Sequence, residues 1–261
     1  AAPMVVAGAG SLKPGGYGVA VAWLRGTAES PLSGMASCTV PEGGALLVTL
    51  PLCLDASVTG VRLYLTRQNG GELLRAGDYP AGTATIELPL LPQLGAPPQF
   101  HRMEPMPSGD HVAVGRGRLL TARANVLRFS EAMAYHVHDP RHGFVQMPQR
   151  ITFVAPVDGG IFVGQVNHVA FLRGAAPNEM SLERLASAAP VPGSAAVLPS
   201  EEVSEASQGG KAGVVWLAGN GFVLGTPDGG IIETRAGRLK GIAGARGTSV
   251  VFGGRVATAV T

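Results

Sequence analysis

Four side chains that can bind a metal ion lie close together in the stretch "YHVHDPRHGF". They are His136, His138, Asp139 and His142. Imidazole and carboxylate groups at this spacing could hold a transition metal if the segment were extended. The Asp-Pro and His-Gly dipeptides in the same stretch favour a solvated surface turn instead. We therefore predict no bound metal, and His168, which stands alone in an expected turn, is predicted to have no chemical role.

Other patterns that carry enzyme chemistry are incomplete or missing. Gly8 and Gly10 resemble the start of a dinucleotide fingerprint, but Pro14 follows where a helix would have to begin. There is no G-x-S-x-G, no P-loop and no evident carboxylate pair for glycoside hydrolysis. The Asp-Gly-Gly segments at 158–160 and 228–230 are typical of hairpin turns. We predict a protein that is not an enzyme, with no catalytic, cofactor-binding or metal-binding residues.

Arginines gather in one short region of the sequence, at Arg116, Arg118, Arg123 and Arg128. If this region formed part of a ring around a channel, they could contact the phosphates of passing DNA without reading its sequence. The alternative is that they lie on solvated strand faces. The net charge of +2 is too small to indicate a nucleic-acid partner by itself.

The composition favours a chain that turns often. Of the 261 residues, 38 are Gly and 20 are Pro, and only 15% are charged. Without a collagen period, this composition with ample Val, Leu and Ile predicts an all-β protein. No apolar stretch reaches the ~18 residues of a membrane span, so no membrane association is expected. No signal peptide is recognised either.

The two cysteines, Cys38 and Cys53, lie near neighbouring predicted strands. They are too few for a disulfide framework, and free buried thiols are favoured over a single disulfide.

Residues 1–92 read as a series of short strands. The segment 17–24 alternates, with Trp23 on its apolar face, and the segment 58–66 places Arg62 and Tyr64 opposite Val61, Leu63 and Leu65. The sequence "QNGG" at 68–71 predicts a hairpin turn. Short strands at this spacing are typical of a β-sandwich, in which Trp23 and Tyr64 are expected in the core. The Pro-rich segment 93–108 predicts a linker.

Residues 109–261 repeat one pattern, in which an apolar run, a Gly turn and a second apolar run follow one another. The repeats are anchored at Val112, Phe153, Val214 and Val250, with Gly117, Gly160, Gly221 and Gly253 expected in the turns. Repeats of about 40–50 residues made of short strands indicate β-propeller-like blades. The segment 187–213 is expected to be an inserted loop. A short helix is expected at 178–186.

The last repeat, 249–261, ends before a third strand. The missing strand is expected from a partner subunit or from residues upstream, since an open blade leaves strand edges unpaired.

Together, "GSLKPGGYGVAVAWLRGTAESPLS", "VTGVRLYLT" and "NVLRFSEAMAYHVHDPRHGFVQMPQRITFVAPVDGGIFVG" resemble a group of tailed-phage and prophage virion structural proteins. In that group a fibronectin type III-like or immunoglobulin-like module is attached to β-propeller-like blades. The resemblance implies a component of the phage tail, such as a hub, a nozzle ring or a fibre anchor. It also implies other virion proteins as partners, and it carries no catalytic residues.

The alternative function is a carbohydrate-binding propeller, an adhesin or lectin with an accessory sandwich domain. Such a protein would repeat aromatic residues at equivalent blade positions, whereas here these positions hold Leu119, Ile161, Phe222 and Val256. The virion protein is therefore the favoured prediction.

Overall fold

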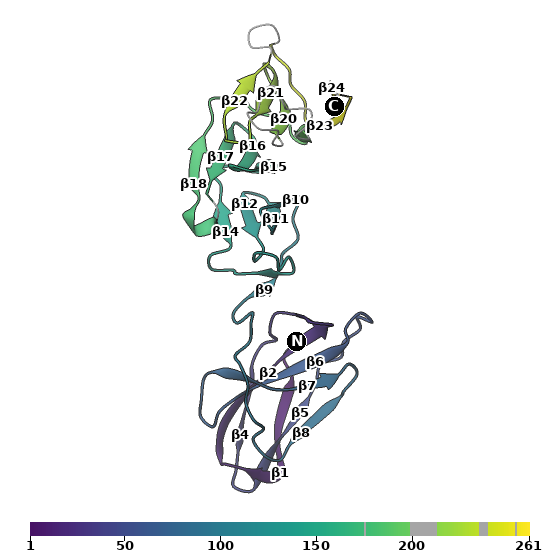
Figure 1. Ribbon diagram of the computed structural model, residues 1–261, viewed down its shortest axis with the longest axis vertical. Helices are drawn as coiled ribbons and strands as arrows, with labels where there is room; N and C mark the ends of the chain where they lie inside the picture. The colour runs from purple at the N-terminus through teal and green to yellow at the C-terminus, as the bar shows by residue number, and fades with distance from the viewer. Residues whose placement is uncertain (175, 199–212, 235–239, 254) are drawn as a thin grey trace. The chain divides into compact units, whose positions relative to one another are not determined.

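The computed structural model describes residues 1–174, 176–198, 213–234, 240–253 and 255–261 (Figure 1). Strands dominate the described residues, and the one helical element among them is a 3-10 turn at Pro177–Glu179. The predicted all-β class is confirmed. No helix in the described part of the chain is long and apolar enough to span a membrane.

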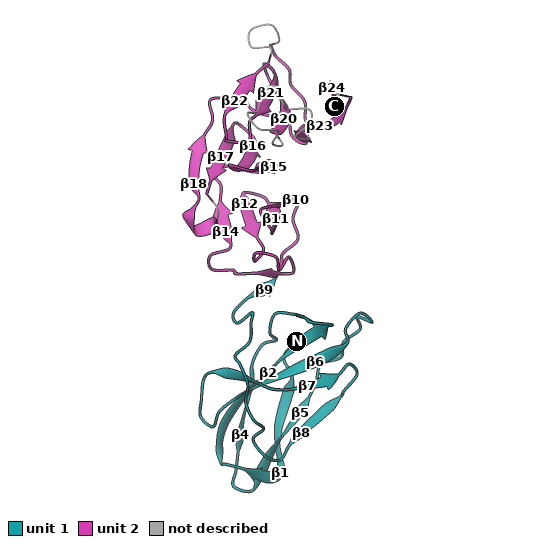
Figure 2. Cartoon of the chain, in the orientation of Figure 1, with its two compact units in different colours: residues 1–105 teal, residues 106–261 magenta. Residues whose placement is uncertain are grey.

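The chain divides into two compact units, Ala1–Pro105 and Met106–Thr261 (Figure 2). The division falls inside the Pro-rich segment 93–108 to which the sequence points. Each unit has hydrophobic clusters of its own.

Short antiparallel strands make up two sheets in unit 1. The strands are β1 (Met4–Leu12), β2 (Gly15–Arg25), β3 (Ala28–Glu29), β4 (Ala36–Val40), β5 (Gly44–Thr49), β6 (Gly60–Thr66), β7 (Leu73–Pro80) and β8 (Thr85–Leu88), followed by the short β9 (Glu104–Pro105). One sheet has the order β1–β5–β8 and the other β3–β2–β6–β7, with β4 also paired to β2. The β6–β7 turn is where "QNGG" predicts it, and Asn69 there adopts a φ of 55°.

Alternation along β2 and β6 directs one face of their sheet into the core of unit 1. Val21 and Leu63 are fully buried there and share one cluster with Leu46 and Val48 of β5, so the two sheets pack over a common core. The predicted apolar faces of both segments are confirmed. Trp23 lies on this face but is only partly buried and packs against the cluster rather than inside it, whereas Tyr64 is 2% exposed.

The opposite face of β6 carries a charged network. Glu29 of β3 is 5% exposed and accepts hydrogen bonds from the Tyr64 hydroxyl at 2.5 Å and from Arg62 Nη1 at 2.7 Å. Arg62 also binds both carboxylate oxygens of Asp78 in β7, at 2.7 and 2.8 Å. The guanidinium of Arg62 lowers the pKa of the Asp78 carboxyl, and burial raises the pKa of Tyr64. This network ties the edge strand β3 to the middle of the sheet.

We predict that Glu29→Ala lowers the free energy of unfolding of unit 1 by about 2–4 kcal/mol, because the substitution leaves the buried Tyr64 hydroxyl without its acceptor and breaks a largely buried ion pair. Urea unfolding measures the change. Asp55→Ala, which removes the exposed ion pair with Arg25, serves as the control and should leave the unfolding midpoint unchanged. Equal midpoints for the two variants would contradict the prediction.

Unit 2 contains successive antiparallel meanders among its described residues. The first sheet consists of β10 (His111–Gly115), β11 (Arg118–Arg123), β12 (Val126–Phe129) and β14 (Phe144–Gln146), and the short β13 (Val137–His138) lies between β12 and β14 in the chain. The second sheet consists of β15 (Ile151–Val157), β16 (Gly160–Gln165), β17 (Val169–Arg173) and β18 (Ser181–Arg184). The third sheet consists of β19 (Ala196–Leu198), β20 (Gly213–Ala218), β21 (Gly221–Gly225) and β22 (Ile231–Glu233), and the fourth of β23 (Gly247–Phe252) and β24 (Arg255–Val260).

Each predicted repeat contains a β-hairpin with a two-residue turn. The residue pairs that close these turns are Gly115 with Arg118, Val157 with Gly160, Ala218 with Gly221, and Phe252 with Arg255. Gly117 and Gly253 lie in their turns with positive φ, as expected. Gly160 and Gly221 instead begin the return strands.

Two predictions for the middle of unit 2 are wrong. Residues 196–198 of the predicted inserted loop form β19, which pairs with β20 and completes the third sheet; residues 199–212 of that loop lie outside the described residues. The predicted helix at 178–186 is a 3-10 turn followed by strand β18, which pairs with β17. A helix this short is marginal by itself, and the ladder with β17 is the more stable choice.

Neighbouring sheets of unit 2 bury their faces against each other. Along β16, Ile161 and Val163 belong to the cluster shared with the first sheet, whereas Phe162 belongs to the cluster shared with the third. On the third sheet, Trp216 faces the second sheet and Val215 faces the fourth. The sheets therefore form one continuous stack, which can be followed from β14 to β24 in Figure 1.

Hydrogen bonds between turns join the first sheet to the second and the second sheet to the third. Arg116 of the first sheet donates to the carbonyl oxygens of Asp158 and Gly174 on the second. Arg173 of the second sheet donates to the Asp228 carbonyl oxygen on the third at 3.0 Å, and its guanidinium lies 5.1 Å from the centre of the Phe171 ring. The Asp-Gly-Gly segments are thus turns, as predicted, and the Gly159 amide of the first donates a hydrogen bond to the carbonyl oxygen of Pro227, directly before the second.

We predict that Gly225→Ala destabilises unit 2 by about 1–3 kcal/mol, the range for overfilling a packed core. A Cβ at this position would stand 2.8 Å from Phe162 Cζ and from Val214 Cγ1, so the second and third sheets would have to separate. Thermal unfolding measures the effect. Gly219→Ala is the matched control, since its Cβ would come no closer than 3.5 Å to other atoms. A Gly225→Ala protein as stable as the control would contradict the prediction, because it would show that the second and third sheets leave room for a Cβ atom.

Candidate functional site

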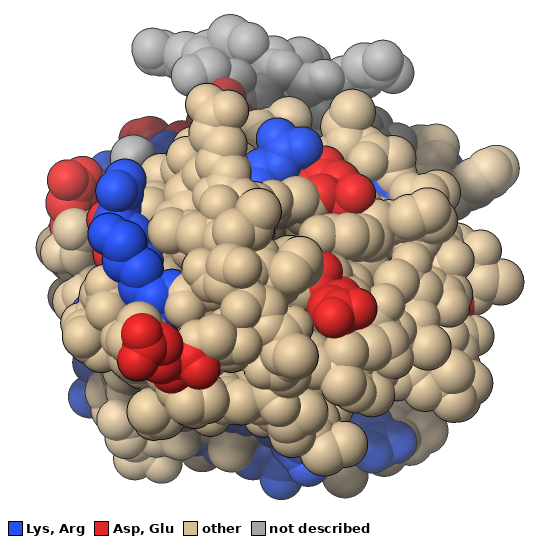
Figure 3. All heavy atoms as spheres, turned by 90° about the horizontal axis from the view of Figure 1, so that it is seen from below, with Lys and Arg blue, Asp and Glu red and all other residues tan. Residues whose placement is uncertain are grey.

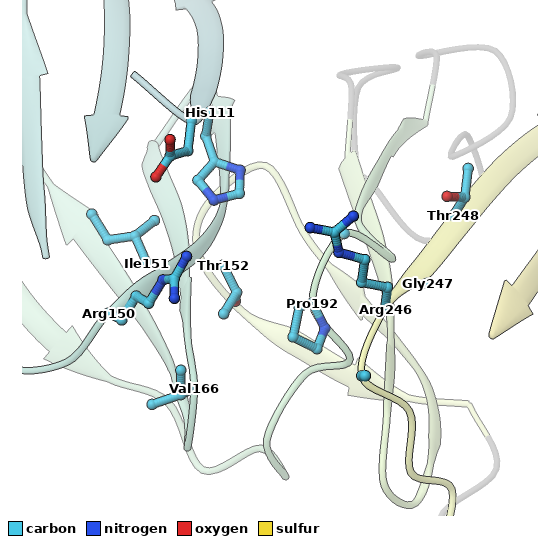
Figure 4. Close-up of a pocket in the computed structure, with 12 residues that line it drawn as sticks. His111, Arg150, Ile151, Thr152, Val166, Pro192, Arg246, Gly247 and Thr248 are labelled. Carbon is cyan, nitrogen blue, oxygen red and sulfur yellow. The ribbon is translucent and has the colours of Figure 1, made fainter. Parts of the chain in front are cut away.

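The first strands of successive sheets border a hollow in unit 2. A cavity of about 640 Å³ is lined by residues 110–111 at the start of β10, 150–152 at the start of β15, 192–193 before β19 and 245–248 at the start of β23, together with Val166. A second cavity of about 310 Å³ continues along β10, β15 and β19. The hollow is therefore bounded by all four sheets, as Figure 4 shows for the larger cavity.

A β-bulge shapes the wall of this hollow. Ile151 pairs with Gln165 and Phe153 pairs with Gly164, so Thr152 is an extra residue in β15. The bulge places Ile151 and Phe153 on opposite faces of the sheet, in different clusters. Thr152 lines both cavities and is 5% exposed, yet its hydroxyl has no hydrogen-bond partner among the residues that the structure describes. Bulges often redirect a side chain in this way next to binding sites.

Charged side chains extend into the larger cavity from opposite walls. In Figure 4, Arg150 and His111 reach the open space from one side and Arg246 from the other. Among the residues that the structure describes, neither arginine has an ion pair or a side-chain hydrogen bond. Asp110 also lines the cavity, so the site carries two guanidinium groups and one carboxylate.

A buried polar cluster holds the backbone next to Arg150. Gln165 is fully buried, and its Oε1 accepts the amide of Gln149 at 2.8 Å. Its side-chain NH₂ group must therefore donate to His168 Nε2 at 2.8 Å, so the His168 proton is on Nδ1 and is donated to Asn167 Oδ1 at 2.5 Å. Burial and the nearby Arg184 lower the pKa of His168, which favours the neutral ring. His168 thus has a structural role that the sequence did not predict.

The histidines of the segment 135–144 differ in burial, since His136 and His142 are exposed and His138 is buried. His138 is 3% exposed and its Nδ1 is 3.0 Å from the Phe129 carbonyl oxygen, so the prediction of a solvated loop is wrong for this residue. Asp139 binds Arg141, which lowers the Asp139 pKa. In the described part of the chain no three His, Cys, Asp or Glu side chains lie close enough to hold a metal ion.

The arginines singled out in the sequence lie away from the hollow. Arg116 joins neighbouring sheets, and Arg118 donates to the Ser130 carbonyl oxygen at 2.6 Å and lies 3.7 Å from Glu131. None of Arg116, Arg118, Arg123 and Arg128 lines the larger cavity. The arginines that do line it, Arg150 and Arg246, stand beside no recognisable sequence motif, and the succession of the sheets brings them to one cavity. Cys38 and Cys53 are both free thiols.

Apolar side chains are exposed on the outer faces of both end sheets of the stack. Val112 and Val114 of the first sheet are 65% and 58% exposed, and Val250 and Phe252 of the fourth are 60% and 84% exposed. Strand alternation places each pair on the face that points away from the neighbouring sheet. On the face drawn in Figure 3, charged side chains form small groups separated by uncharged surface.

Neither a protein-family model nor a curated protein matches this chain.

We predict that unit 2 loses stability as the pH falls from 7.5 to 5. The pKa of His168 is lowered in the folded protein, so the unfolded chain binds the proton more readily, and the stability present above the ordinary value of 6.5 is lost below it. Urea unfolding at several pH values measures the slope. His168→Gln, which cannot be protonated, should flatten it. An unchanged slope in this variant would show that other groups cause the dependence.

Proposed function

We propose that this chain is a non-enzymatic structural component of a tailed-phage virion, located in the tail as a hub or nozzle ring or as a fibre anchor. Its partners would be other virion proteins and further copies of itself. The observation that carries the proposal is the pair of exposed apolar faces at the two ends of the stack, because exposed apolar patches mark protein–protein contacts.

The pairing of strands supports the two modules of this proposal. In unit 1 the neighbours β1–β5 and β2–β6–β7 correspond to the B–E and C–F–G pairs of an immunoglobulin-like sandwich, and β3 and β4 add to the same edge of β2. In unit 2, three four-stranded meanders and the two-stranded β23–β24 sheet border a common hollow with their first strands, which is the arrangement that propeller-like blades require.

The arrangement of the end faces supports a ring. The outer face of the first sheet and that of the fourth sheet are different surfaces, so contact between them would join copies head to tail. A head-to-tail interface closes into a ring when its rotation permits. Such a ring would enclose the hollow and let DNA pass without sequence readout.

We predict that the purified protein forms oligomers and that Phe252→Asp shifts them to monomers, because the new charge would have to be buried in the contact. Sedimentation velocity at several concentrations gives the mass. Leu182→Asp, at a 47% exposed apolar position on β18, is the matched control and should leave the mass unchanged.

A monomeric wild-type protein at high concentration would contradict self-assembly. The location is tested separately by mass spectrometry of purified phage particles from cells that carry the gene, in which peptides of this chain are expected in constant ratio to the major tail proteins. Particles that lack these peptides would overturn the proposal.

A further inference from the structure

We propose that the larger cavity of unit 2 binds the phosphate group of a small phosphate ester, with Arg150, Arg246, His111 and the Thr152 hydroxyl as its ligands. The proposal concerns this cavity alone and does not rest on the virion function.

The donor groups fit a phosphate. Two guanidinium groups approach one space from opposite walls, and an imidazole enters it from a third element (Figure 4). A phosphate has oxygens pointing in several directions and can accept hydrogen bonds from several walls at once, whereas a carboxylate presents two oxygens in one plane. Arginine is well suited to such contacts because it offers several donors in a fixed geometry.

Thr152 supplies an independent sign of a ligand. A buried hydroxyl without a partner costs free energy, and native proteins seldom retain one without a reason. This hydroxyl belongs to the extra residue of the bulge, which is one of the lining residues of the cavity, and no described residue is its hydrogen-bond partner. An oxyanion in the cavity would accept its hydrogen bond and would also balance the charge of Arg150 and Arg246, which form no ion pair with any described residue.

The size and charge of the cavity indicate more than a bare phosphate ion. A volume of about 640 Å³ falls in the range typical of small-molecule sites. Asp110 on the same wall would repel a second phosphate and could accept a hydrogen bond from a ligand hydroxyl. A single phosphate attached to a hydroxylated body matches this combination better than a polyanion.

The experiment is isothermal titration calorimetry of the full chain with inorganic phosphate, with ribose 5-phosphate and with an oligothymidylate. We expect saturable binding of ribose 5-phosphate, weaker binding of inorganic phosphate, and about tenfold or greater loss of affinity in Arg150→Gln and in Arg246→Gln, since each removes a charge-assisted hydrogen bond. Arg123→Gln, an exposed arginine outside the cavity, is the control and should bind as the wild type does.

Thr152→Val separates binding from folding. The valine has the shape of threonine without the unpartnered hydroxyl, so the variant should unfold at the same or a higher temperature while its affinity for ribose 5-phosphate falls. A stable variant with unchanged affinity would overturn the role of Thr152.

Absence of binding by both small phosphates would overturn the proposal, as would binding that both arginine variants retain. Binding of oligothymidylate in preference to ribose 5-phosphate, lost in the arginine variants, would overturn the small ester as ligand and assign the site to a nucleic-acid backbone.

Discussion

The architecture of unit 2 depends on one constraint: a small sheet of short strands has two apolar faces, and both must be covered. A single sheet cannot cover itself, so each interior sheet needs a neighbour on either side. The second sheet meets this need with Ile161 and Val163 on one face and Phe162 on the other. The same constraint explains why glycines such as Gly225 stand where two sheets are in close contact. It also explains why Arg116 and Arg173 bind carbonyl oxygens of the next sheet, because sheets that pack directly against each other bring their turns close together.

The sequence predicted the parts of this structure that depend on local patterns. Gly-containing turns between apolar runs predict the hairpins of unit 2, and Asn69-Gly70 predicts the β6–β7 turn. Alternation predicts which residues enter the core, as it does for Leu63. The sequence did not predict β18 and β19, because neither segment has a strong strand pattern. Each becomes a strand by pairing with the edge strand of a sheet, β18 with β17 and β19 with β20. Pairing of this kind is decided by tertiary context rather than by local propensity.

The candidate site was hidden from the sequence for a related reason. Threonine is common in strands, so nothing in the sequence singles out Thr152. The β-bulge at this position, which interrupts the alternation of the strand, appears only in the structure. Arg150 and Arg246 are separated by most of unit 2, and only the succession of sheets brings them to one cavity. Of the conspicuous histidines and arginines of the sequence, His138, His168, Arg116 and Arg118 instead form hydrogen bonds that hold turns and strands in place.

The serial stack also affects how the protein reaches its native state. In unit 2 each sheet is made from one continuous segment, and its buried faces meet only sheets that come directly before or after it in the chain. Contacts between segments close in sequence cost little loop entropy and form quickly. Unit 1 must join Met4 to Thr49 before its first sheet exists. During synthesis unit 2 can therefore fold sheet by sheet as the chain leaves the ribosome, each finished sheet serving as the template for the next.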